Sequence, residues 1–180
     1  AKELKINNKI IENLTSLYNI YPNLTLISNK KKQLEVKKQI EKIWPQLYEF
    51  TRKRKKELGY RDKFLIIKNF PFEQKSKKIR DLIVFAFSLG FGNPSATDLK
   101  EKKIIWDITP INNNMSKWTT FSQNNKAAEL HTDSQYRLKP EKFVALFVLK
   151  QAKDGGTSYV LNYRKAIESL SKTIPGKKCI

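Results

Sequence analysis

One stretch decides the predicted fold: LHTDSQYRLKPEKFVALFVLKQAKDGGTSYVL (130–161), which contains the only histidine of the sequence. His131 and Asp133 are two residues apart, so on an extended strand both side chains lie on the same face. An imidazole and a carboxylate on one face suit a single metal ion. By itself the pair is a weak signal, because a surface histidine beside a turn aspartate gives the same pattern. The apolar run 143–149 and the turn at Gly155-Gly156 indicate further strands.

The composition bounds the class of protein. The chain has 180 residues, of which 39% are hydrophobic and 11% aromatic, and this predicts one folded domain rather than a disordered chain. The net charge of +19 suggests an anionic partner. However, most of the basic residues are lysines spread through the whole sequence, so we interpret the charge mainly as compositional bias.

The cellular compartment is inferred from the cysteine count and the apolar stretches. Cys179 is the only cysteine, which excludes an internal disulfide. The N-terminus lacks the apolar run of a signal peptide, and apolar stretches such as 82–87 are too short to span a bilayer. We therefore expect a cytoplasmic protein without a membrane partner.

The spacing of apolar residues predicts helices mainly in the first half of the chain. Apolar residues recur at helical spacing at 10–18, 36–47 and 79–86. A last helix is predicted at 163–171. Pro45 predicts a kink or a new helix start within the second of these. Gly59 and Gly90 predict helix ends.

Short runs of strand-forming residues dominate the second half. They are found at 64–67, 104–108, 117–122, 143–149 and 158–161. We therefore expect an α+β protein with a helical N-terminal region at 1–60 and a second region, rich in strands, at 61–180.

The order and spacing of the motifs in the second region resemble those of a known family. LHTDSQY (130–136), Pro140, the strand 143–149 and GGTS (155–158) are similar to the taurine and gamma-butyrobetaine dioxygenases, also called clavaminate synthase-like. The resemblance is closest over 130–170, is looser over 64–122 and includes little of the first sixty residues. It implies a double-stranded β-helix, a cupin-like jelly roll. It also implies an Fe(II)- and 2-oxoglutarate-dependent dioxygenase that uses dioxygen.

The resemblance assigns roles to four residues. His131 and Asp133 would be two iron ligands. Ser158 would hydrogen-bond the co-substrate 2-oxoglutarate, and Thr157 is a second, weaker candidate. The alternative for these last two is that they only follow a turn between strands. The implied substrate is small and polar, such as an amino-acid-like molecule.

Two residues that the family pattern requires are missing from the sequence. The family has a second histidine further along the chain and an arginine about ten residues beyond that histidine. This sequence has no histidine other than His131, and no arginine follows Arg164. The predicted strands are also too few to close an eight-stranded jelly roll. We therefore expect a jelly roll that is incomplete at its C-terminus and completed by a remaining C-terminal segment or a second chain.

The alternative function is a non-catalytic basic module that binds nucleic acid or another anionic partner on a degenerate dioxygenase scaffold. Basic residues at 51–56 follow Trp44, Tyr48 and Phe50, and cations with aromatic rings are typical of nucleic-acid patches. A solvated helix face gives the same pattern, and we favour that interpretation.

Glu129 precedes the segment that contains His131 and Asp133. Its side chain could approach a cleft beside the predicted metal site, or it could face solvent.

Overall fold

The computed structural model describes residues 4–23, 27–59, 64–71, 75–96, 102–109, 127–134 and 137–173, and all structural statements refer to these. In this part the elements are helices: α1 (Asn8–Ile20), α2 (Lys30–Ile43), α3 (Pro45–Leu58), α4 (Lys77–Phe91) and α5 (Tyr163–Leu170). All the predicted helical stretches are confirmed.

Local side chains determine where the helices begin and end. The carboxamide oxygens of Asn7, Asn29 and Asn162 accept hydrogen bonds from the first free backbone N–H groups of α1, α2 and α5. Pro45 occupies the first turn of α3, where its missing N–H costs nothing, so the predicted new helix start is confirmed. Gly59, with φ +61°, ends α3 as predicted.

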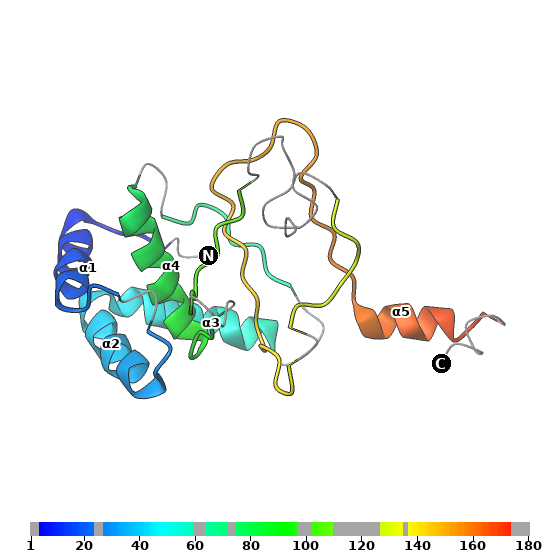
Figure 1. The fold of residues 1–180 in the computed structure, drawn as a ribbon, viewed down its shortest axis with the longest axis horizontal. Helices are drawn as coiled ribbons and strands as arrows, with labels where there is room; N and C mark the ends of the chain where they lie inside the picture. Colours follow the sequence, from blue (N-terminus) through cyan, green and yellow to red (C-terminus); the bar gives the residue numbers. More distant parts are fainter. Residues whose placement is uncertain are drawn as a thin grey trace.

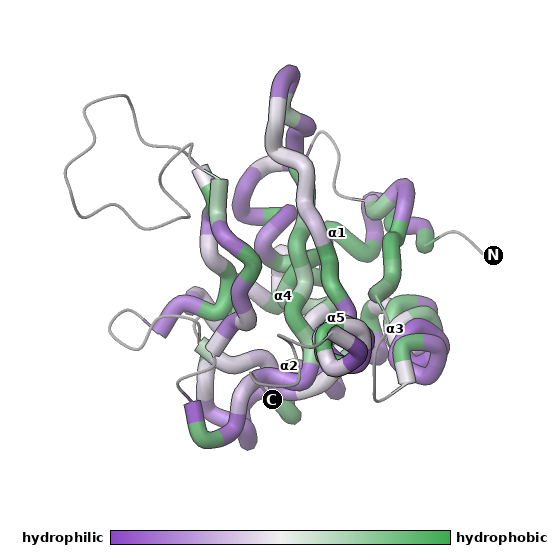
Figure 2. The backbone as a smooth tube through the Cα atoms, turned by 90° about the vertical axis from the view of Figure 1, so that its right-hand side faces the viewer, coloured by the Kyte–Doolittle hydropathy of each residue, from purple (hydrophilic) through white to green (hydrophobic). Residues whose placement is uncertain are grey.

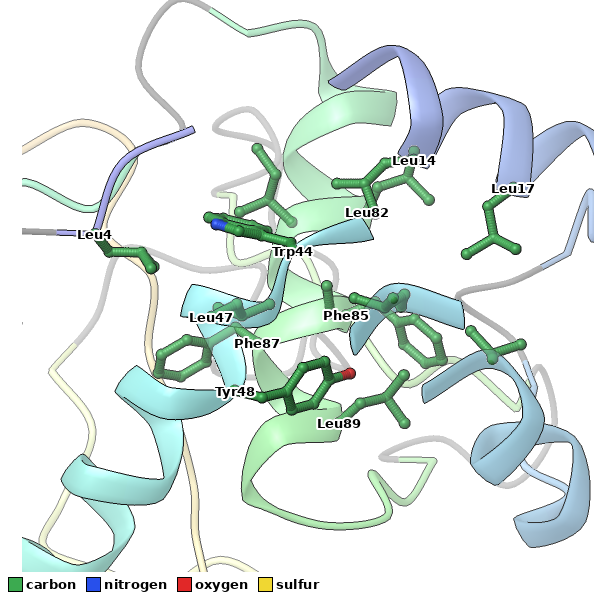
Figure 3. Close-up of a cluster of buried hydrophobic side chains, with 14 residues drawn as sticks. Leu4, Leu14, Leu17, Trp44, Leu47, Tyr48, Leu82, Phe85, Phe87 and Leu89 are labelled. Carbon is green, nitrogen blue, oxygen red and sulfur yellow. The ribbon is translucent and has the colours of Figure 1, made fainter. Parts of the chain in front are cut away.

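The hydrophobic core lies between the first four helices. α4 contributes a continuous buried set that includes Leu82, Ile83 and Phe85, and Ile40 of α2 and Leu47 of α3 pack against it. Figure 3 shows Leu82 and Phe85 of α4 in one cluster with Leu47 of α3 and with Leu14 and Leu17 of α1. The core therefore includes residues on both sides of position 60. Figure 1 shows α1–α4 gathered together and α5 projecting away from them.

The predicted jelly roll is wrong for the part of the chain that the structure describes. The stretches 64–67, 104–108, 143–149 and 158–161 have irregular backbone with no strand pairing, and 117–122 lies outside the described residues. The observed class is thus helical with long irregular segments, rather than α+β. A strand exists only when its backbone hydrogen-bonds a neighbour, and the apolar pattern of one stretch cannot supply that neighbour.

Aromatic contacts fix the irregular stretch 143–149 to the helical core. The ring centroid of Phe147 lies 5.6 Å from that of Phe87 and 5.3 Å from that of Phe70. Phe143 contacts Phe91 at 5.7 Å in the same edge-on manner. The two phenylalanines thus face α4.

Apolar side chains between and after these two phenylalanines face solvent. Val144, Leu146 and Val148 are exposed, and so are residues 159–161, which lead into α5. Figure 2, in which the backbone is coloured by residue hydropathy, shows hydrophobic segments outside the group of helices α1–α4. In the residues described, no helix has both the length and the apolar character to cross a membrane.

Candidate functional site

The structure brings His131 and Asp133 side by side. Nε2 of His131 lies 3.5 Å from Oδ1 of Asp133, and both side chains are about half exposed. The two residues lie in irregular backbone and a turn, not in the predicted strand, and Ser134 after them adopts a left-handed conformation with φ +55°. The turn therefore places the two side chains together by a different route from the one that the sequence predicts.

A backbone carbonyl sets the orientation of the imidazole. Nδ1 of His131 lies 2.7 Å from the carbonyl oxygen of Glu129, and since a carbonyl only accepts, Nδ1–H must be the donor. In the neutral ring the lone pair is then on Nε2, the nitrogen that faces Asp133. Histidine ligands of metals commonly donate their other N–H to a carbonyl in this way. Glu129 thus contributes through its backbone carbonyl and not through the side chain for which the sequence suggests a role.

The donor set fits a metal such as Fe(II). Metal–ligand bonds of about 2.1 Å place neighbouring ligand atoms roughly 3.0–3.4 Å apart, close to the 3.5 Å observed between Nε2 and Oδ1. One imidazole and one carboxylate are also the ligand types of non-haem iron sites. The described residues contain no group of three or more histidine, cysteine, aspartate or glutamate side chains able to hold a metal. Within these residues the candidate site therefore consists of two ligands, His131 and Asp133.

Thr157 and Ser158 lie on a separate exposed stretch. Gly155 and Gly156 both have φ +69°, a conformation that glycine adopts without strain. The bend in this stretch lies at residues 153–154, just before the two glycines at which the sequence predicts a turn. Both hydroxyl residues are open to solvent, so they are accessible to a small molecule.

A polar network that the sequence analysis did not single out borders the His131–Asp133 turn. The guanidinium of Arg137 pairs with the carboxylate of Glu141 and donates to the carbonyl of Ala96 at 2.9 Å. The hydroxyl of Ser95 donates to Glu141 at 2.8 Å. Hydrogen bonds from Ser134 and Ser95 and the charge of Arg137 outweigh the opposing effect of burial and hold the pKa of Glu141 below its usual range. The sequence carries no signal for this network, because 137–141 is not helical and its partners Ser95 and Ala96 are distant in the chain.

The structure uses much of the proposed nucleic-acid patch for packing. Trp44 and Tyr48 are buried in the core, where they cannot stack on bases, and burial with the nearby charge of Glu41 raises the pKa of Tyr48. Arg54 pairs with Glu57 and lies over the ring of Phe50. Two of the three rings that the alternative function requires are thus buried, and the third, Phe50, is partly buried and lies under Arg54.

Comparison with known protein families gives a match over most of the chain. A family model described as taurine catabolism dioxygenase TauD, TfdA family, matches residues 32–177. The match takes in α2 and α3 as well as the His131–Asp133 turn and the segment up to α5. No curated protein and no solved structure matches the chain.

Proposed function

Because this chain belongs to the TauD/TfdA family of dioxygenases, we propose that it acts as an Fe(II)- and 2-oxoglutarate-dependent dioxygenase on a small, polar, amino-acid-like substrate. The observation that supports the proposal is the pair formed by His131 and Asp133, with Nε2 and Oδ1 3.5 Å apart. Fe(II) and 2-oxoglutarate, when bound, supply the chemistry by which dioxygen hydroxylates a C–H bond while 2-oxoglutarate becomes succinate and carbon dioxide.

The residues of the chain have distinct tasks in this proposal. His131 would bind the metal through Nε2, with Glu129 holding the ring orientation through its carbonyl. Asp133 would supply the carboxylate ligand and balance the charge of the metal. Ser158, or Thr157 beside it, would donate a hydroxyl hydrogen bond to a carboxylate of 2-oxoglutarate.

Further protein ligands would come from a remaining C-terminal segment or a second chain. The apolar side chains of Val144, Leu146 and Val148 are exposed, so they are available to such a partner. Contact there would bury this apolar surface.

The test compares Asp133→Ala with Asp154→Ala, since both residues are exposed aspartates in irregular backbone. We expect the natural protein to bind Fe(II) without oxygen, to show a weak visible absorption band when 2-oxoglutarate is added, and to form succinate in air. Asp133→Ala should lose the band and reduce succinate formation at least a hundredfold, because the proposed carboxylate ligand of the metal is removed. Asp154→Ala should leave both unchanged.

Two results would contradict the proposal. One is an Asp133→Ala variant that retains the absorption band and normal succinate formation. The other is a natural protein that has no affinity for Fe(II) but binds DNA or RNA with strong salt dependence, which would favour the basic module instead.

A further inference from the structure

We propose that Arg137 and Glu141 are positioning residues that hold the His131–Asp133 turn in its metal-binding conformation, an inference that rests on the proposed function. Neither residue is placed as a ligand. Their effect would be exerted through Ser134, the residue that directly follows Asp133, and through the segment that follows α4.

The two side chains form a largely buried, charge-assisted junction. Their exposed fractions are 19% for Arg137 and 23% for Glu141, well below those of the ligand pair. Arg137 reaches Ala96 with one nitrogen and Glu141 with another, while Ser95 donates to the same carboxylate. Partial burial protects such hydrogen bonds from the screening that weakens ion pairs at the surface.

The turn is held at two points next to Asp133. One is a backbone hydrogen bond, in which the N–H of Arg137 donates to the carbonyl of Ser134 at 2.9 Å. The junction supplies the other, because the side chain of Ser134 hydrogen-bonds the carboxylate of Glu141. Ser134 needs this support because a left-handed backbone, here with φ +55°, is strained for a residue other than glycine. Without the junction, the backbone next to Asp133 would relax to other conformations.

Packing cannot replace these hydrogen bonds. Residues 127–133 are exposed, so burial in the core contributes little to the position of the turn. Ser95 and Ala96, in contrast, come four and five residues after Phe91, the last residue of α4 and a neighbour of the core. The junction therefore connects an exposed ligand turn to the helical body of the protein.

The single histidine gives a direct measurement of metal binding at this turn. Because the imidazole proton signals come from His131 alone, their paramagnetic broadening by Mn(II) in the presence of 2-oxoglutarate reports on this site. We expect Arg137→Ala and Glu141→Ala each to raise the Mn(II) concentration for half-broadening about tenfold, the usual effect of losing support behind a ligand. The double variant should cost little more than either single variant. Lys139→Ala, an exposed charge in the same segment, should have no effect.

The melting temperature distinguishes positioning from general stability. It should change little in Glu141→Gln and Ser95→Ala, which keep most of the volume and whose affinities for Mn(II) should still fall. These two variants carry the test if Arg137→Ala does not fold. Broadening of the variants at the same Mn(II) concentration as the natural protein would overturn the positioning role alone. If Mn(II) fails to broaden the natural protein, or broadens Asp133→Ala equally, the metal site and the positioning role are both overturned.

Discussion

Trp44→Ala should lower the free energy of unfolding by about 3–5 kcal/mol, the usual cost of removing a fully buried aromatic side chain. Trp44 has no exposed surface and lies at the junction of α2 and α3, within the core shown in Figure 3. The neighbouring helices can close the cavity only in part, because their side chains are already packed. Since domains of this kind are stable by only about 5–15 kcal/mol, the loss should be obvious in urea unfolding followed by circular dichroism.

Two matched variants make this result specific. Trp106 is 40% exposed, so Trp106→Ala should cost far less than Trp44→Ala. Trp44→Phe should also be mild, because the indole Nε1 of Trp44 has no hydrogen-bond partner in the described part of the chain and its loss leaves no broken bond. Equal destabilisation by the two alanine variants would show that Trp44 is not a central core residue.

The helices could be predicted because their signals are local. Apolar spacing identified the faces that α1 to α4 bury, and Pro45 and Gly59 identified the limits of α3. The pattern in 143–149 is local too, and Phe143 and Phe147 do face α4 while Val144 and Leu146 face outward. Strand formation, however, requires a hydrogen-bonding partner from elsewhere in the chain, which no single stretch of sequence reveals.

The candidate site shows the same division between local and distant information. Proximity of His131 and Asp133 could be predicted because two residues separated by one have few ways to diverge, although a turn and not a strand brings them together. The junction of Arg137 and Glu141 with Ser95 could not, since its partners are more than forty residues apart in sequence. Only their contact in space shows that the turn is connected to the segment after α4.

Gly90 is a glycine whose role in the structure differs from the role that the sequence predicts. The sequence predicts that it ends the helix, but α4 continues to Phe91 and Gly92 is the C-cap. A Cβ atom on Gly90 would lie 2.3 Å from Oγ1 of Thr51 and 2.7 Å from both Cβ and Cγ2 of that residue. The glycine therefore permits the close approach of α3 and α4, and its missing side chain has nothing to do with a turn.

Gly90→Ala should consequently destabilise the protein, even though alanine favours a helix over glycine by about 1 kcal/mol. Overpacking costs about 1–3 kcal/mol, and Thr51 cannot easily move because it is fully buried and its hydroxyl donates to the carbonyl of Tyr48. Gly92→Ala is the matched control, since a Cβ there meets nothing within 4 Å and its φ of 170° suits any residue.

The crossing of α3 and α4 predicts a coupling between positions 51 and 90. In a Thr51→Ala background the hydroxyl and methyl groups are gone, so only the Cβ contact at 2.7 Å is left and Gly90→Ala should cost less. Urea unfolding of the four proteins of this double-mutant cycle measures the difference. Two results would contradict the close approach of α3 and α4: a Gly90→Ala variant as stable as Gly92→Ala, or a loss of stability in Gly90→Ala that is the same with and without Thr51→Ala. Either result would mean that α4 packs on α3 in a different arrangement.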